Sequence, residues 1–460
     1  MSGRIRVDFL ISHVSANPDA PGECNVISHN EQSPFLDVNP ADYQYPIRWG
    51  EAIGIELEYM IVDRETLAVK PIADELLRAV TGAYTTDAEP GGPDFNVGWS
   101  NELALHIIEL KTARPAEVSF APYVARFQSD IRLINETLDA LGARLMPTAM
   151  HPWMDPEREL KLWPHEYGPV YHAYNRIFGC RGHGWANLQS THINLPFGND
   201  VEFGRLHAAI RLVLPILPAL AASSPIVEGR VTGPCDNRLI AYRGNAARIP
   251  SITGCVVPEP IFARAAYERD ILGRMYQDIA EHDPEAILQH EWLNSRGAIA
   301  RFERGSIEIR VIDIQECPAA DLAIVAATVR VIEHLVSEKI SDIASQQQAS
   351  TEGLAATLER TERTAGEAVI DDVTCLRAFG LADERRISVG ELWSHLIAQT
   401  RPVPEPGDDP FAPTLHVLLT EGCLARRIVR ATGQEPDRAR LHEVYRELCD
   451  CLHAGRLFVP

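Results

Sequence analysis

The segment GIELEYMIVD, residues 54–63, carries two glutamates inside an otherwise apolar run. Glu56 and Glu58 are two residues apart, and side chains two apart on a β-strand point to the same face of a sheet. Two carboxylates held side by side repel each other, and burying them costs free energy unless a positive group compensates. The pair therefore predicts a site that holds a cation.

Three further segments alternate like strands and place polar side chains on one face. These side chains are Glu109 with Lys111, His192 with Asn194, and Glu308 with Arg310. A single glutamate on a half-exposed strand usually just faces solvent. Because the pattern is repeated on four strands, with Ile, Leu and Val on the opposite faces, it favours one shared polar site instead.

Hard cations are the positive groups that such a site suits best. Mg²⁺ prefers carboxylate oxygens and keeps water and phosphate oxygens as its other ligands. Glutamates from several strands can hold two or three such ions around a triphosphate. The planar fork of Arg310 suits a phosphate oxygen or a carboxylate. Arg238 and Arg243, in DNRLIAYRG, either contribute to nucleotide binding or lie on a solvated helix face or in surface ion pairs.

Other catalytic signatures are missing from the sequence. There is no GxxxxGK[ST], HExxH or GxSxG motif, and the glycines of GCRGHG are in the wrong order for GxGxxG. P-loop chemistry and a nucleophilic serine therefore have no support. The spacing of His151, His165, His183 and His192 fits no compact zinc signature.

Composition limits the class of protein. The chain has 460 residues, 45% of them hydrophobic, and a formal net charge of −21, which argues against nucleic acid as a main partner. Nine cysteines without a CxxC pair predict reduced thiols and a cytoplasmic location. No signal peptide is visible. The apolar segment 211–227 contains three prolines and predicts a buried helical segment rather than a membrane span.

The elements that must position the polar residues predict an α+β fold. Strands are expected at 54–63, 105–111 and 187–198. A hairpin is expected over 298–315, with its turn at Arg304 and Gly305, and a loop is expected over 87–100. Helical spacing covers 119–141 and 319–336. Because the strands do not follow a βαβ rhythm, we expect an antiparallel sheet with flanking helices. We expect an N-terminal arm over 1–45, a catalytic domain over 46–345, and a helical C-terminal region over 346–460 packed on it.

Five segments in this order resemble the glutamate–cysteine ligase type 2 family, carboxylate–amine ligases of the glutamine-synthetase superfamily. They are GIELEYMIVD, ELALHIIELKT, ARLMPTAMHPW, STHINLPF and GSIEIRVIDIQECPAADLAIVAATVRVI. The resemblance covers roughly residues 50 to 340. It implies a curved antiparallel sheet that forms a funnel, with ATP entering from one side and two or three Mg²⁺ ions on glutamates.

By the same resemblance, individual residues acquire expected roles. The positions that match metal ligands are Glu56, Glu58, Glu109 and Glu308. Arg310 matches a residue that faces the transferred phosphate, and Asn194 one that approaches nucleotide or metal. Many members carry two histidines in an HVHV-like run, where this chain has STHIN with only His192.

The implied activity is that of an ATP-dependent carbon–nitrogen ligase. ATP would convert a carboxylate, most plausibly the γ-carboxylate of glutamate, into an acyl phosphate, and an amine or an amino acid such as cysteine would then attack it. An acidic residue or His192 would accept the proton of the amine. Two alternatives stay open: a small-molecule phosphotransferase of the same superfamily, and a catalytically degenerate relative that binds nucleotide. The expected partners are a small carboxylate and an amine, with no nucleic acid and no membrane. The oligomeric state stays open, a homo-oligomer included.

Overall fold

The structure is a computed structural model that describes residues 44–92, 96–117, 120–381, 383–401 and 409–460. Its centre is a nine-stranded sheet with the order β10-β11-β7-β1-β4-β3-β2, in which β5 and β6 also pair with β1. The strands are β1 (Ala52–Asp63), β2 (Asp87–Ala88), β3 (Val97–Asn101), β4 (Ile107–Thr112), β5 (Ala116–Glu117), β6 (Ala143–Met146), β7 (Ser190–Pro196), β10 (Ala298–Arg301) and β11 (Ser306–Asp313). All of their pairings are antiparallel. The predicted α+β class is therefore confirmed, while the predicted arm over 1–45 lies almost entirely outside the described residues.

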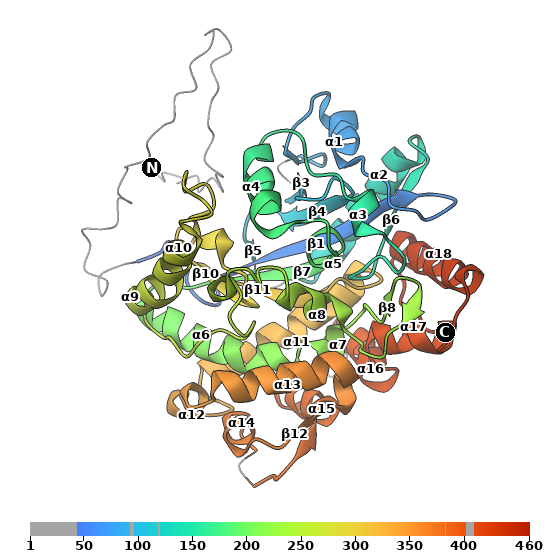
Figure 1. The fold of residues 1–460 in the computed structure, drawn as a ribbon. Coiled ribbons are helices and arrows are strands. Elements are labelled where there is room, and N and C mark those ends of the chain that lie inside the picture. Colours follow the sequence, from blue (N-terminus) through green and yellow to red (C-terminus); the bar gives the residue numbers. More distant parts are fainter. Residues whose placement is uncertain (1–43, 93–95, 118–119, 382, 402–408) are drawn as a thin grey trace, which may run out of the picture.

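Helices surround this sheet and make up most of the C-terminal third (Figure 1). They are α1 (Ala73–Thr81), α2 (Pro122–Asp139), α3 (Pro156–Glu159), α4 (Gly168–Phe178), α5 (His183–Ala186), α6 (Asp200–Val213), α7 (Pro218–Ala221), α8 (Asn237–Arg243), α9 (Arg264–Tyr267), α10 (Gly273–Ile279), α11 (Pro318–Val336), α12 (Ile343–Gln347), α13 (Thr351–Thr364), α14 (Val373–Ala378), α15 (Val389–Gln399), α16 (Ala412–Thr420), α17 (Leu424–Thr432) and α18 (Arg438–Ala454). Two small two-stranded sheets lie outside the main sheet: β8 (Ile226–Val227) with β9 (Arg230–Val231), and β12 (Val369–Ile370) with β13 (Ile387–Ser388). The predicted domain boundary near residue 345 stays a prediction.

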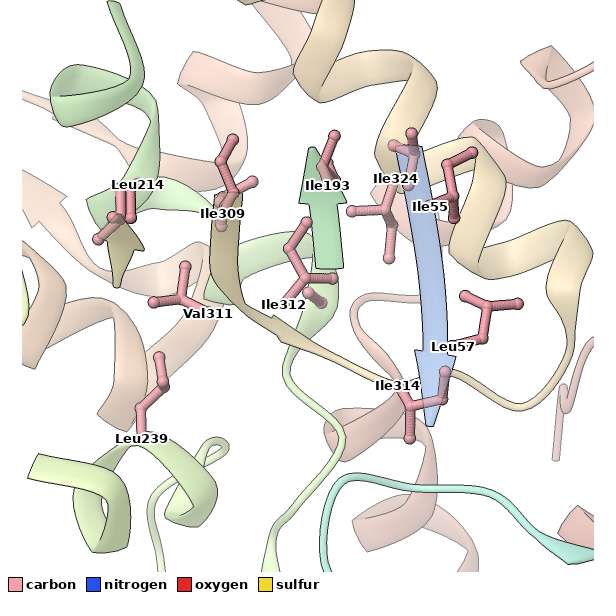
Figure 2. Close-up of a cluster of buried hydrophobic side chains, with 14 of the residues drawn as sticks. Ile55, Leu57, Ile193, Leu214, Leu239, Ile309, Val311, Ile312, Ile314 and Ile324 are labelled. Carbon is pink, nitrogen blue, oxygen red and sulfur yellow. The ribbon is translucent and has the colours of Figure 1, made fainter. Parts of the chain in front are cut away.

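One face of the sheet is apolar because the strands alternate. Ile55, Leu57 and Tyr59 of β1 have no exposed surface. Figure 2 shows Ile55 and Leu57 in one apolar cluster with Ile193 of β7 and Ile324 of α11. Burying each such side chain contributes about 1.5–3 kcal/mol. Packing against α11 therefore fixes which face of β1 is buried, and with it the opposite face on which Glu56 and Glu58 lie.

Several local predictions are confirmed. The hairpin of β10 and β11 turns through Arg304 and Gly305, and Gly305 has the positive φ of 66° that such a turn requires. Residues 211–221 of the predicted buried helical segment form the end of α6, the short helix η2 (Leu214–Ile216) and α7, all buried, while its last residues, Ile226 and Val227, form strand β8. Within the described part of the chain, no helix combines the length and hydropathy needed to cross a membrane.

The loop expected over 87–100 is wrong in part, because it contains β2 and β3. β3 has only five residues, among them Gly98 and Asn101, whose types are rare in strands, so its sequence alone does not predict a strand. The strand exists because Val97 to Asn101 pair residue by residue with β4. Its formation is thus decided by a partner strand and not by its own pattern.

The buried imidazole of His207 in α6 leads to a prediction about acid stability. It lies among the rings of Phe203, Phe262 and Tyr267. Burial, together with the charge of Arg211, lowers the pKa of His207 to about 3. The unfolded chain takes up this proton near pH 6.5, so folding loses stability as the pH falls below that value. Below pH 6, this proton uptake lowers the free energy of unfolding by about 1.4 kcal/mol per pH unit, and replacing His207 with Phe should abolish that decrease.

Urea unfolding of the wild type and His207→Phe at pH 7.5, 6 and 5 measures this difference. Only the difference between the two proteins is interpreted, because other buried groups titrate in both. Equal pH dependence of their unfolding free energies would contradict the prediction.

Candidate active site

Four neighbouring strands place the predicted polar residues on one face of the sheet. The order β11-β7-β1-β4 makes them adjacent. Cross-strand register sets Glu56 opposite His192, Glu58 opposite Glu109, and Glu308 opposite Asn194. Because directly opposite residues share a face, the register alone gathers these side chains.

His192 lies at the centre of this group. Its Nδ1 is 2.8 Å from Glu56 Oε2 and 3.9 Å from Glu308 Oε1. Its Nε2 is 2.8 Å from Ser190 Oγ and 3.8 Å from Glu58 Oε1. Ser190 uses its only hydroxyl proton to donate a hydrogen bond to Glu58 Oε2, at 2.8 Å, so Ser190 Oγ accepts a hydrogen bond from the Nε2–H of His192. Both ring nitrogens therefore donate, and His192 is an imidazolium.

Electrostatics agree with this protonation state. Burial by itself lowers the pKa of His192, but the hydrogen bond to Glu56 and the charges of Glu58, Glu56 and Glu308 raise it to about 9. Glu56 is buried, which raises its pKa, yet His192 holds the pKa of that carboxyl well below its usual range. Asn194 Nδ2 donates to the other oxygen of Glu56 at 2.9 Å. A positive charge of the chain itself thus compensates the paired glutamates of β1.

Glu308 is held between two arginines. Arg310 Nε lies 3.0 Å from Glu308 Oε1, and Arg301 Nη1 donates to Oε2 at 3.1 Å. Burial raises the pKa of Glu308, but Arg310 and Arg301 lower it more, so the carboxyl is ionised. Arg310 Nη1 donates to the carbonyl of Asn294 at 3.3 Å, which fixes the plane of the guanidinium.

Glu109 completes the other side of the cluster. It accepts a hydrogen bond from Ser100 Oγ at 2.6 Å, and Lys111 Nζ lies 3.5 Å away. Burial and the charge of Glu56 raise the pKa of Glu109 to about 7. Free carboxylates here repel one another, so binding a cation would stabilise this edge of the site.

Glu102 belongs to the same acidic group, and sequence reasoning missed it. Burial and the charges of Glu58 and Glu109 raise its pKa well above the usual range. It lies in the turn between β3 and β4, outside both strands. A search for strand alternation therefore passes over it, although it stands in the same segment as Glu109.

The donor set fits divalent cations held mainly by carboxylates. Two groups, Glu56 with His192 and Glu308, and Glu58 with Glu109 and His192, offer ligand atoms that all lie within 4.8 Å of one another. Carboxylate oxygens are the ligands that Mg²⁺ prefers. His192 belongs to both groups but carries two protons, so it can ligate a metal only after losing one.

The structure brings together all of the predicted site residues except two. Arg243 of α8 donates from Nη2 to both oxygens of Glu362 on α13, at 2.6 and 2.8 Å. Arg238 is 2% exposed, and it donates from Nη2 to the carbonyl of Arg310 at 2.8 Å. Arg243 pairs with Glu362 and Arg238 with Asp313 at the end of β11, rather than with Glu56, Glu58, Glu109 or Glu308, and the nucleotide-binding role of both arginines stays a prediction.

Comparisons with known proteins agree on one family. The family model described as "Glutamate-cysteine ligase family 2(GCS2)" matches residues 52–447. A protein of Archaeoglobus fulgidus named "Uncharacterized protein" is 38% identical over 274 residues, which are 60% of this chain and 72% of that protein. A protein of Salinispora tropica named "Putative glutamate--cysteine ligase 2" is 26% identical over 410 residues, covering 76% of this chain and 96% of that one.

A solved structure shares the fold. The crystal structure of glutamate–cysteine ligase from Francisella tularensis in complex with AMP aligns with a TM-score of 0.57 at 12% sequence identity. The alignment covers 89% of this chain and 90% of that one. At this level of identity, the likeness concerns the fold alone.

Proposed function

The chain belongs to glutamate–cysteine ligase family 2, and we propose that it is an ATP-dependent carbon–nitrogen ligase. In this proposal it activates the γ-carboxylate of glutamate as an acyl phosphate and joins it to an amine or an amino acid such as cysteine. The observation that carries the proposal is the convergence of Glu56, Glu308, His192 and Arg310 on one face of the sheet. Paired carboxylates next to a fixed guanidinium suit phosphoryl transfer, which depends on positioning and charge compensation.

Mg²⁺ is the cofactor that the donor set supports. The residues that would hold two or three ions are Glu56, Glu58, Glu109 and Glu308. When bound, Mg²⁺ would supply positive charge to the phosphate oxygens of ATP. The carboxylates of the site would then have positive charge beyond that of His192, Lys111, Arg301 and Arg310.

The residues of the chain would act on charge and orientation. Arg310, held by Glu308 and the Asn294 carbonyl, presents its remaining N–H groups to the transferred phosphoryl group. Asn194 orients Glu56 through a hydrogen bond. His192 cannot accept the proton of the amine while it lies between three carboxylates as an imidazolium. It serves as a base only after that proton has left.

A screen for ADP formation tests the proposal. The protein is incubated with Mg²⁺, ATP and glutamate, with and without each member of an amine library, and ADP and product mass are measured. ADP release that requires an amine, together with a glutamyl amide of the expected mass, supports a ligase. ADP release with a phosphorylated small molecule and no need for an amine supports a phosphotransferase instead. ATP binding without turnover across the panel supports the degenerate relative.

The acidic cluster also predicts that Mg²⁺ and ATP stabilise the fold together. A ligand that binds only the folded state adds about 2.7 kcal/mol at 100 times its Kd. In a chain of 460 residues, this raises the melting midpoint by about 3 °C, because the shift per kcal/mol shrinks with size. We expect Mg²⁺ with ATP to exceed the sum of the two separate shifts, because each completes the coordination of the other.

Melting curves with Mg²⁺, ATP, both, and ATP with a chelator measure this synergy. The double variant Glu56→Gln, Glu308→Gln should lose this synergy. The control Glu65→Gln should keep it, because it removes an exposed carboxylate just after the same strand. If ATP stabilises the protein equally well in the presence of chelator, the hypothesis of a metal ion in this site is wrong.

A further inference from the structure

The strand that carries Glu308 and Arg310 contains a β-bulge opposite His192. Ile309 pairs with Ile193, and the next pair along β11 is Ile312 with Thr191. Two residues of β11, Arg310 and Val311, therefore face the single residue between the partners on β7, which is His192. A bulge of this kind interrupts the ladder, bends the strand and re-aims a side chain, and bulges are common next to active sites.

The bulge changes which side chains reach each face of the sheet. Strict alternation would put Ile312 on the face of Glu308 and Arg310. Instead, Figure 2 shows Ile309, Val311 and Ile312 in the apolar cluster on the other face. After the bulge, Asp313 pairs with Ser190, whose hydroxyl bonds Glu58, so Asp313 returns to the site face. Arg310 is thus the one residue of 309–312 directed at the carboxylates.

The backbone of Arg310 bonds to groups outside β7. Its N–H donates to the carbonyl of Gly297 at 2.9 Å. Its carbonyl accepts from Arg238 Nη2 at 2.8 Å. A bulged residue leaves ladder groups unpaired, and a buried carbonyl without a donor costs about 1–3 kcal/mol. Arg238 supplies the missing donor.

Arg238 is itself held by the residue on the far side of the bulge. Its Nη1 lies 3.5 Å from Asp313 Oδ1, and the two side chains are 3% and 0% exposed. Asp313 Oδ2 accepts from the hydroxyl of Ser224 at 2.9 Å, and the same hydroxyl accepts from the backbone N–H of Arg238 at 3.2 Å. This closed network spans the bulge from Arg310 to Asp313.

We propose that Arg238 is a positioning residue for the reaction, which fixes the bulge of β11 and so holds the guanidinium of Arg310 beside Glu308. This role rests on the proposed function, and it replaces the direct nucleotide contact that the sequence suggested for Arg238. A displacement of about 1 Å at a reacting group can lower a rate by about 100-fold. Loss of Arg238 should therefore act on the rate of the chemical step and not on ATP affinity.

Kinetics of two variants test the role: the single variant Arg238→Met and the double variant Arg238→Met, Asp313→Asn. The double variant is included because Asp313→Asn removes the buried carboxylate that would otherwise lose its partner. We expect kcat to fall by about 10- to 100-fold while the KM for ATP changes less than about threefold. Arg238→Lys, which keeps one donor, should recover part of the rate. A raised KM with an unchanged kcat would overturn the proposal and return Arg238 to nucleotide binding.

Combination with Arg310→Lys separates positioning from general stability. If Arg238 acts through Arg310, its replacement should have little further effect on kcat once the fork of Arg310 is gone, whereas additive losses would overturn the proposal. The matched control is Arg211→Met, which removes a fully buried arginine bonded to the carbonyls of Pro258 and Ala349 away from the site. This control should lower the melting midpoint without changing kcat per folded molecule.

A crystal structure of Arg238→Met keeps the inference independent of the activity assay. A shifted register at 309–312, with Arg310 Nε moved away from its 3.0 Å contact with Glu308, supports the proposal. An unchanged bulge with Arg310 in place overturns it. If the wild type shows no amine-dependent ADP release, the proposed function fails, and this structure alone decides whether Arg238 positions Arg310.

Discussion

Glu56→Gln should lower turnover by about 1000-fold or more and leave the protein folded. The change keeps the volume of the side chain and removes a charge from the ligand group formed with His192 and Glu308. A loss of this size equals about 4 kcal/mol of transition-state stabilisation, within what a metal ion supplies to phosphoryl chemistry. Asn194 can still donate to the amide oxygen that replaces Oε1, so the site keeps part of its hydrogen bonding.

Steady-state ADP release and thermal melting, measured on the same preparations, give the rate and the fold separately. Glu65→Gln provides the control, because its exposed carboxylate lies just after β1 and outside the acidic cluster. A folded Glu56→Gln protein with the wild-type rate would remove Glu56 from the catalytic site.

Arg310→Lys should reduce kcat by about 100-fold while the KM for ATP rises less than about fivefold. The guanidinium contacts Glu308 and the Asn294 carbonyl at the same time, and its planar fork leaves further donors in a fixed direction. An ammonium keeps the charge but cannot make this set of contacts. The loss therefore falls on interactions that strengthen in the transition state.

Initial rates at varied ATP and glutamate separate the two constants for Arg310→Lys. The control is Lys339→Arg, an exchange between lysine and arginine at an exposed position after α11, which should leave both constants unchanged. A raised KM for ATP with kcat unchanged would assign Arg310 to ground-state binding.

The sequence predicted the strands that carry the site because each alternates between apolar and polar residues. In β1, Ile55 and Leu57 alternate with Glu56 and Glu58, and the buried face is confirmed. Alternation on β7 and β11 likewise assigned His192 and Glu308 to the same face. These positions follow from the pleat of a strand, which the sequence encodes locally.

The remaining features depend on contacts between distant segments. β3 has only five residues, and it contains Gly98 and Asn101, whose types are rare in strands. Glu102 lies in a turn where no periodicity applies. The charge of His192 follows from three carboxylates on two other strands, and none of them is near it in sequence. The sequence of α8 does not show whether Arg238 faces solvent or the carbonyl of a bulged strand.

The separation of the site residues along the chain has a consequence for protein synthesis. Glu56 leaves the ribosome early, whereas Glu308 and Arg310 follow only after most of the catalytic region has been made. Strand β11 then pairs with β7 and β10 in a sheet whose other strands all precede it in sequence. A nascent chain without β11 lacks the Glu308 and Arg310 side of the candidate site. In the proposed ligase, complete nucleotide binding would thus be restricted to chains translated through β11.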